Sequence, residues 1–290
     1  MGIYKGKSTE GLLTYLTEKW KIALDNGNVV SVVFIDFKKA FDCVSHSILN
    51  LKLGPLKPVS FGNKILSYVN TSICLGVVID SKLSWQPQIT AVCKTFSQKV
   101  KYLKQLRVKP KKVLEAIYFR SIVPSATYGI LVWGTCSPAL LHNVERIHLR
   151  AAKIMYSFAD INLETLKYIH WQPLMNIYKL RLTSLMYSVY YGLAPKSICN
   201  LFHITEPQHY HLRRAEGFNV PKYNHSIGRT SLSYRGPTAW NILPESYKLI
   251  DSYASFKQKI KKDRALLNKL ILDKESRFYF TPNLFYCIHT

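Results

Sequence analysis

Several features that mark other classes of protein are missing from this sequence. Its six cysteines include no CxxC pair, so the sequence indicates neither a disulfide framework nor a common zinc finger. No run of about eighteen apolar residues occurs, which argues against a membrane-spanning helix. The amino terminus, MGIYKGKSTE, lacks the apolar core of a signal peptide. We therefore expect an intracellular protein, cytoplasmic or nuclear, that is neither secreted nor bound to a membrane.

Acidic residues are also scarce. The 290 residues include 17 Asp and Glu against 40 Lys and Arg, which gives a formal net charge of +23 at pH 7. Between Ser81 and Leu114 no residue is acidic, whereas nine are Lys or Arg. Such a surplus attracts polyanions, and nucleic acid is the first candidate. Basic ribosomal, membrane-surface and heparin-binding proteins share the trait, so charge alone does not decide among them.

Apolar residues recur mostly at helical spacing, with a few short runs typical of buried strands. A hydrophobic content of 48% is that of a globular protein. Strand patterns cover Val29–Ile35 and Cys74–Asp80. We expect loops with short strands over residues 203–244, where His, Arg, Gly and Pro are frequent. Helices are predicted after Ser8, over Val92–Leu106, from Lys111, after Pro138 and Pro173, and over Ser255–Leu270.

The most specific motif is FIDFKKAFDCVSH, from Phe34 to His46. Together with its flanking segments it resembles the reverse transcriptases of non-LTR (LINE-like) retrotransposons, such as the jockey-type elements. The resemblance implies that Asp36 is a catalytic carboxylate that binds Mg²⁺, and that Phe41 contacts the nucleotide substrate as a steric gate. LGVVIDSKLSW (Leu75–Trp85), YFRSIVPSATYGILVWG (Tyr118–Gly134) and SYRGPTAWNILP (Ser233–Pro244) resemble later parts of the same family.

The family's second catalytic strand is missing from this sequence. That strand carries two adjacent aspartates, and no Asp-Asp pair occurs here at any position. Polymerases position two metal ions with several carboxylates, so Asp36 alone makes an incomplete site. Asp80 also ends a strand pattern, but the resemblance places its segment outside the active site. We therefore expect a truncated polymerase relative with an internal deletion of the palm, which does not hold Mg²⁺ productively and is inactive.

The resemblance also implies a domain organisation. Residues 1–53 correspond to a partial fingers and palm, residues 54–135 to the deletion junction and a basic thumb-like region, and residues 136–290 to a carboxy-terminal helical domain with a loop-rich segment at 203–244. The expected fold class is α+β and predominantly α. It combines a partial polymerase palm of few strands with thumb-like and carboxy-terminal helices.

The thumb-like region supplies the candidate nucleic-acid contacts. Apolar residues at helical spacing leave the basic ones on the opposite face, so we expect an amphipathic basic helix. In the intact family this region faces the template–primer, which implies RNA and DNA as partners. The predicted contact residues are Lys94, Lys99, Lys101, Lys104, Arg107, Lys109, Lys111 and Lys112.

Three hypotheses remain open at this point. The chain is a degenerate, inactive reverse transcriptase, or a module that binds nucleic acid without catalysis, or a working polymerase whose central segment was lost in the gene model. Cys199, His203, His209 and His211 lie close together, but their spacing matches no common zinc finger, and we interpret them as solvated surface residues.

Overall fold

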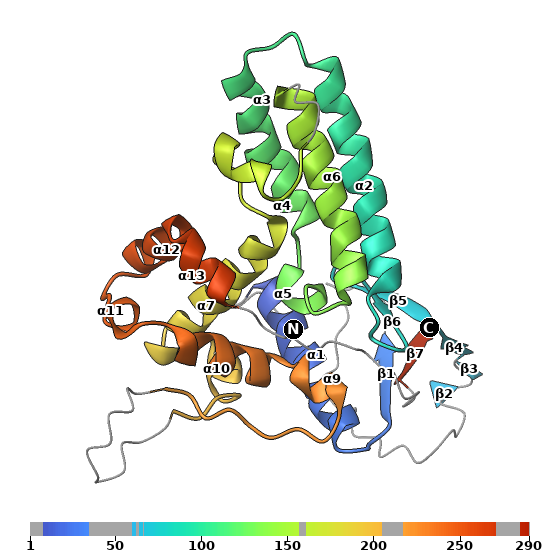
Figure 1. Cartoon of the computed structure of the whole chain (residues 1–290). Helices are drawn as coiled ribbons and strands as arrows, with labels where there is room; N and C mark the ends of the chain where they lie inside the picture. Colours follow the sequence, from blue (N-terminus) through green and yellow to red (C-terminus); the bar gives the residue numbers. More distant parts are fainter. Residues whose placement is uncertain are drawn as a thin grey trace, which may run out of the picture.

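The structure, a computed structural model, describes residues 8–34, 60–61, 64–65, 67–156, 161–204, 217–270 and 285–289. Helices predominate in this part of the chain, and the strands form small sheets, so the expected α+β, mainly helical fold is confirmed. The helices form an upper and a lower group that meet near α1 (Figure 1). None of the described helices is long and apolar enough to cross a membrane.

The first helix and strand lie where the sequence places them. Ser8 caps α1 (Thr9–Asp25) by accepting a hydrogen bond from the Gly11 N–H at 3.0 Å, and Gly27, with φ +75°, reverses the chain after it. β1 (Val30–Phe34) follows. It pairs in parallel with β7 (Phe285–His289), which pairs on its other edge with the antiparallel strand β4 (Ser67–Val69). β2 (Ser60–Phe61) and β3 (Lys64–Ile65) form a separate pair.

A hairpin replaces the single strand expected over Cys74–Asp80. β5 (Thr71–Cys74) and β6 (Val77–Asp80) pair in antiparallel register around a two-residue turn. Both turn residues have positive φ, +48° at Leu75 and +78° at Gly76, and such a turn matches the twist of the flanking strands. The sequence pattern did not predict this turn, because the segment is a run of apolar residues in which Gly76 is the one residue typical of a turn.

The upper group of helices contains the expected basic helix. α2 (Gln86–Gln105) buries Phe96, Val100 and Leu103, as the spacing predicts, and packs along α6 (Pro138–Tyr156). The two helices run side by side in the same direction (Figure 1). Between them the chain forms α3 (Lys111–Ile117), a π-helical turn (Tyr118–Ile122), α4 (Val123–Ala126) and α5 (Ile130–Trp133).

The lower group surrounds α7 (Leu174–Tyr190), which begins after Pro173 as expected. Two expectations are wrong here. Helices α9 (Ser226–Arg229) and α10 (Leu232–Ile242) lie where loops with short strands were predicted, and the single helix expected over Ser255–Leu270 is broken at Asp263. The remaining elements are the 3₁₀ turn Thr165–Ile169, α8 (Lys196–Cys199), α11 (Glu245–Lys248), α12 (Tyr253–Lys262) and α13 (Arg264–Lys269).

Local chemistry explains both differences. α10 contains Gly236 and Pro237, which disfavour a helix interior, but the buried Trp240 anchors it and its amino-terminal N–H groups are satisfied by other parts of the chain. At the break, the Asp263 carboxylate accepts a hydrogen bond from the Leu266 N–H at 2.8 Å, so it caps a new helix instead of continuing the old one.

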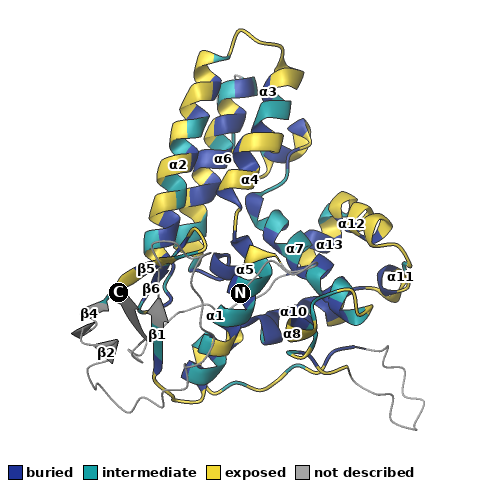
Figure 2. Cartoon of the chain, turned by 180° about the vertical axis from the view of Figure 1, so that it is seen from behind, coloured by how far each residue is buried: buried dark blue, intermediate teal, exposed yellow. Residues whose placement is uncertain are grey.

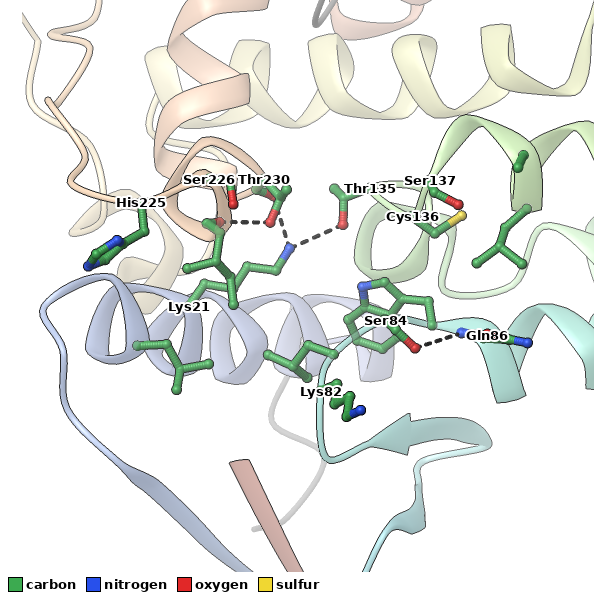
Figure 3. Close-up of a pocket in the computed structure, with 16 residues that line it drawn as sticks. Lys21, Lys82, Ser84, Gln86, Thr135, Cys136, Ser137, His225, Ser226 and Thr230 are labelled. Atoms are coloured by element: carbon green, nitrogen blue, oxygen red, sulfur yellow. Dashed lines mark hydrogen bonds between the residues drawn. The ribbon is translucent and has the colours of Figure 1, made fainter. Parts of the chain in front are cut away.

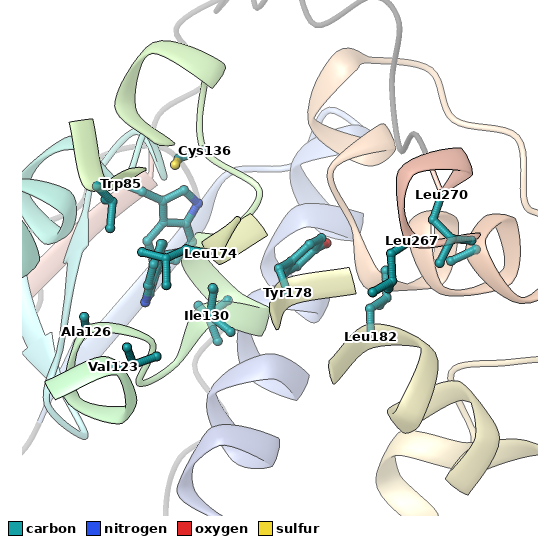
Figure 4. Packing of buried hydrophobic residues seen from close by; sticks show 14 of the residues in the cluster. Trp85, Val123, Ala126, Ile130, Cys136, Leu174, Tyr178, Leu182, Leu267 and Leu270 are labelled. Carbon is teal, nitrogen blue, oxygen red and sulfur yellow. The ribbon is translucent and has the colours of Figure 1, made fainter. Parts of the chain in front are cut away.

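One apolar core links the two groups of helices. In Figure 4, Trp85 and Ile130 lie on one side, Tyr178 of α7 in the middle, and Leu267 of α13 on the other side. This core includes Leu13 of α1, so it draws on all three predicted segments, 1–53, 54–135 and 136–290. The outward faces of the upper helices and of α12 are exposed (Figure 2).

Candidate functional site

The predicted metal ligand Asp36 and the predicted steric gate Phe41 lie outside the described residues, as do His209 and His211. β1, which leads towards Asp36, ends at Phe34. In the described part of the chain, no group of three or more His, Cys, Asp and Glu side chains is placed to hold a metal ion.

Asp80 has a structural task. It is almost fully buried at the end of β6, where its two carboxylate oxygens accept hydrogen bonds from the backbone N–H groups of Ser84, at 2.9 Å, and Trp85, at 2.8 Å. Both oxygens thereby hold the turn that leads into α2. These two bonds give Asp80 a structural role in the fold.

The eight predicted nucleic-acid contacts lie on one continuous structural unit. We call α2, α3 and the turn between them, residues 86–117, the basic arm. Seven of the eight side chains are exposed, and Lys99 is partly buried. The arm has this character because the apolar stripe of α2 faces α6, which turns the basic residues outward. Its connecting turn is the far end of the upper helix group (Figure 1).

The acidic residues of the upper helix group do not offset this charge at the surface. Residues 81–156 contain thirteen Lys and Arg but only Glu115 and Glu145. Glu115 accepts hydrogen bonds from the Tyr156 hydroxyl and, at 3.1 Å, from Trp171 Nε1. Glu145 is buried and accepts from the Leu174 N–H at the start of α7, and burial raises its pKa to about 7. Outside the protein the field of these helices is therefore positive.

α6 adds three cations that the sequence reasoning did not single out. Arg146, Arg150 and Lys153 are all exposed and recur at helical spacing. The same periodicity that places Ile147 and Ala151 in the core places these three residues outside. The signal was therefore present, but it lay beyond the acid-free stretch that defined the candidate region.

Aromatic and apolar side chains are exposed among the arm's charges. Tyr102 is 62% exposed and Val108, in the connecting turn, is 96% exposed. Tyr102 therefore presents its ring to solvent, where a base could stack on it. Lys111, by contrast, already has a partner, because its ammonium lies 4.4 Å from the centre of the Tyr156 ring.

α1 carries a row of buried polar residues that no sequence pattern indicated. Glu18 accepts from the N–H groups of Leu232 and Ser233, and Asp25 accepts from those of Asn224 and His225. Lys21 lies between these two carboxylates on the helix and is also buried.

We compared the chain with models of protein families, with curated proteins and with solved structures, and it matches none of them. The proposals below therefore depend on the motif around Asp36 and on the geometry of the described residues.

Proposed function

We propose that this chain is a nucleic-acid-binding protein derived from the reverse transcriptase of a non-LTR retrotransposon, and that it does not polymerise DNA. The observation that carries the binding proposal is the basic arm. Its exposed cations lie on a surface of the upper helix group where the described acidic side chains are buried or hydrogen-bonded. The motif Phe34–His46 carries the proposal of ancestry.

In this proposal the basic arm corresponds to the thumb of the polymerase. Residues around α1 and β1 are the remnant of fingers and palm, and the helices after Pro138 form the carboxy-terminal domain. Lysine and arginine contacts to phosphates release counterions, so binding should weaken steeply as salt rises. The ligands are RNA and DNA, encountered in the cytoplasm or the nucleus, and contacts to phosphate give little sequence preference.

The proposed lack of catalysis follows from the carboxylate metal ligands that the sequence lacks. Two-metal phosphoryl transfer needs several carboxylates in fixed positions. The sequence has Asp36 but no Asp-Asp pair. The carboxylates of this sequence therefore do not fit a two-metal site.

Fluorescence anisotropy with a labelled RNA–DNA hybrid, titrated over a series of salt concentrations, tests the binding proposal. The test variant is the triple substitution Lys101→Gln, Lys104→Gln and Lys109→Gln, three exposed positions of the arm. We expect affinity to fall at least tenfold and the salt slope to shrink by roughly 3, because each lost phosphate contact removes about 0.9.

A matched control removes the same charge elsewhere. Lys257→Gln, Lys261→Gln and Lys262→Gln alter three exposed residues of α12, in the lower helix group. If both triple variants lose affinity equally, the arm is not the interface and net charge alone accounts for binding. Affinity that does not respond to salt would contradict the proposal altogether.

Primer extension on an RNA template tests the proposed inactivity. With either Mg²⁺ or Mn²⁺ we expect no elongated product from the chain. Elongation that Asp36→Ala abolishes would show a complete active site and overturn this half of the proposal.

A further inference from the structure

A cavity of about 310 Å³ lies where α1 meets the beginnings of α2 and α6 (Figure 3). Its walls come from α1, from the loop between β6 and α2, from the loop that leads into α6, and from the segment around α9. Its volume is at the lower end of the range for small-molecule sites. The cavity lies at the opposite end of α2 from the turn of the basic arm.

Lys21 places a buried ammonium group in this cavity. Its Nζ donates a hydrogen bond to the backbone carbonyl of Thr230, at 2.9 Å, and another to the hydroxyl of Thr135, at 3.2 Å. These use two of the three N–H donors of an ammonium group. Figure 3 shows the side chain extending from α1 towards these two partners. A buried lysine is costly to retain unless its charge is compensated, and here Glu18, three residues earlier on α1, compensates part of it.

The rest of the lining also favours an anionic ligand. The residues of the wall include a second lysine, the exposed Lys82, and no Asp or Glu. α2 and α6, 20 and 19 residues long, both begin at the cavity, and neither has an acidic residue in its first turn. Their dipoles add positive potential there, although Asp80 offsets part of that from α2.

Much of the remaining wall is apolar. Leu140 and Ile227 belong to it and are partly exposed, whereas Leu83 and Trp85, which also line it, are nearly fully buried. A bare inorganic ion would leave Leu140 and Ile227 in contact with water, whereas a ligand with an apolar body would cover them.

We propose that this cavity binds a small organic anion, with its charged group at Lys21 and its apolar body against Leu140 and Ile227. Burial lowers the pKa of Lys21 to about 7, so near neutral pH the site can present a charged ammonium, and a bound anion would favour that form. The proposal is independent of nucleic-acid binding by the arm.

Isothermal titration with three probes tests the two halves of this recognition. Phenyl phosphate carries both an anionic group and a ring, phenol carries the ring alone, and inorganic phosphate the charge alone. We expect phenyl phosphate to bind roughly tenfold or more tightly than either, and to change the tryptophan fluorescence because Trp85 lines the cavity. Equal binding of phenol and phenyl phosphate, or no saturable binding of phenyl phosphate, would overturn the proposal.

Variants place the probe in the cavity. Lys21→Met should weaken phenyl phosphate roughly tenfold while leaving phenol unchanged, and Lys82→Gln should weaken it several-fold. Lys109→Gln, an exposed lysine of the arm, is the matched control and should have no effect. Phenyl phosphate binding that is the same in Lys82→Gln and in Lys109→Gln, with Lys21→Met also unchanged, would contradict the assignment.

Because Lys21 is buried, a second variant keeps the test valid if Lys21→Met fails to fold. Ala139 is an exposed residue of the lining at the start of α6, and Ala139→Trp adds bulk there without removing any charge. It should abolish phenyl phosphate binding and leave the unfolding midpoint within the range of surface substitutions. Unchanged affinity in this variant would place the probe elsewhere.

Discussion

His148 is held neutral inside the upper helix group. Its Nε2 lies 3.0 Å from the carbonyl oxygen of Gln172, to which it must donate, so its Nδ1 accepts from the Tyr118 hydroxyl at 2.5 Å. The ring also lies against Trp171. Burial lowers the pKa of His148 to about 4. Both nitrogens of the neutral ring thus have partners.

His148 should make the protein sensitive to acid. An unfolded histidine binds a proton near pH 6.5, and folded His148 only near pH 4, so between these values the unfolded state binds more protons. Stability is therefore lost as pH falls through this window, by roughly 3 kcal/mol from this residue. Urea unfolding at a series of pH values should show a shallower loss in His148→Gln than in the wild type.

His142→Gln is the matched control, because His142 lies on the same helix but is exposed. Glu145, whose pKa burial raises to about 7, acts in the opposite direction over part of the window. It is unchanged in both variants, so the difference between them isolates His148. Equal slopes in His148→Gln and His142→Gln would contradict the prediction.

Lys21 should affect the free energy of unfolding at higher pH than His148 does. Burial, opposed by Glu18 and reinforced by Arg235, lowers its pKa to about 7, whereas an unfolded lysine titrates near pH 10.4. The unfolded state therefore binds more protons above pH 7, and the contribution of Lys21 to stability rises with pH. From about pH 7 to about pH 8.5 we expect a gain of about 1.5 kcal/mol, absent from Lys21→Met.

The upper limit of that window is set by Cys136, whose pKa burial raises to about 12 and which therefore opposes the gain once unfolded thiols ionise. Lys19→Met, on the same helix but exposed, should retain the gain. A stability that stays flat over the window in the wild type, or rises equally in Lys21→Met, would show that Lys21 keeps its charge when the chain folds.

At the scale of elements, α10 depends on a carboxylate from α1. Glu18 accepts from the N–H of Leu232 and, at 2.9 Å, from the N–H of Ser233, the first two residues of that helix. Glu18→Ala leaves both donors buried without this acceptor, so we expect a loss of roughly 3 kcal/mol in the free energy of unfolding. Circular dichroism during urea unfolding measures it.

Glu10→Ala supplies the comparison. Glu10 lies on the same helix and forms an ion pair with Arg181 at 3.0 Å, but both side chains are partly exposed. Such a pair contributes about 1 kcal/mol or less. If Glu18→Ala costs no more than Glu10→Ala, the α10 N–H groups find other acceptors and the cap is dispensable.

This dependence shows why some elements were predictable from the sequence and others were not. Apolar spacing and local signals such as Ser8 and Pro173 predict the helices α1, α2, α6 and α7. These signals lie within the helices or directly beside them. α10 contains Gly236 and Pro237, which disfavour a helix, and Glu18, which stabilises its first turn, lies more than two hundred residues away in sequence. No local pattern encodes such a contact.

The same argument applies to the candidate sites. The basic arm could be predicted because charge and helical period occur together in one stretch of sequence. The cavity around Lys21 could not, because its lining comes from four separate parts of the chain, and the burial of a lysine is visible only once they are assembled.

At the scale of the molecule, α1 joins the two groups of helices. It packs against α5 of the upper group and against α9 and α10 of the lower group. Glu18, Lys21 and Asp25 all bond to residues 224–233, and the Lys21 ammonium also reaches Thr135. The amino-terminal helix is therefore part of the fold of residues that follow it by some two hundred positions.

Removing residues 1–28 should therefore prevent the rest of the chain from folding cooperatively. The fragment 29–290 would expose the apolar surface that Leu13 and Leu24 cover, together with the N–H groups that Glu18 and Asp25 satisfy. We expect it to bind a hydrophobic dye and to unfold without a sharp transition. A synthetic peptide of residues 8–29, added in trans, should restore the transition, and a peptide with Glu18→Ala should restore it less. A fragment that unfolds at the full-length midpoint without the peptide would show that the rest of the fold does not depend on α1.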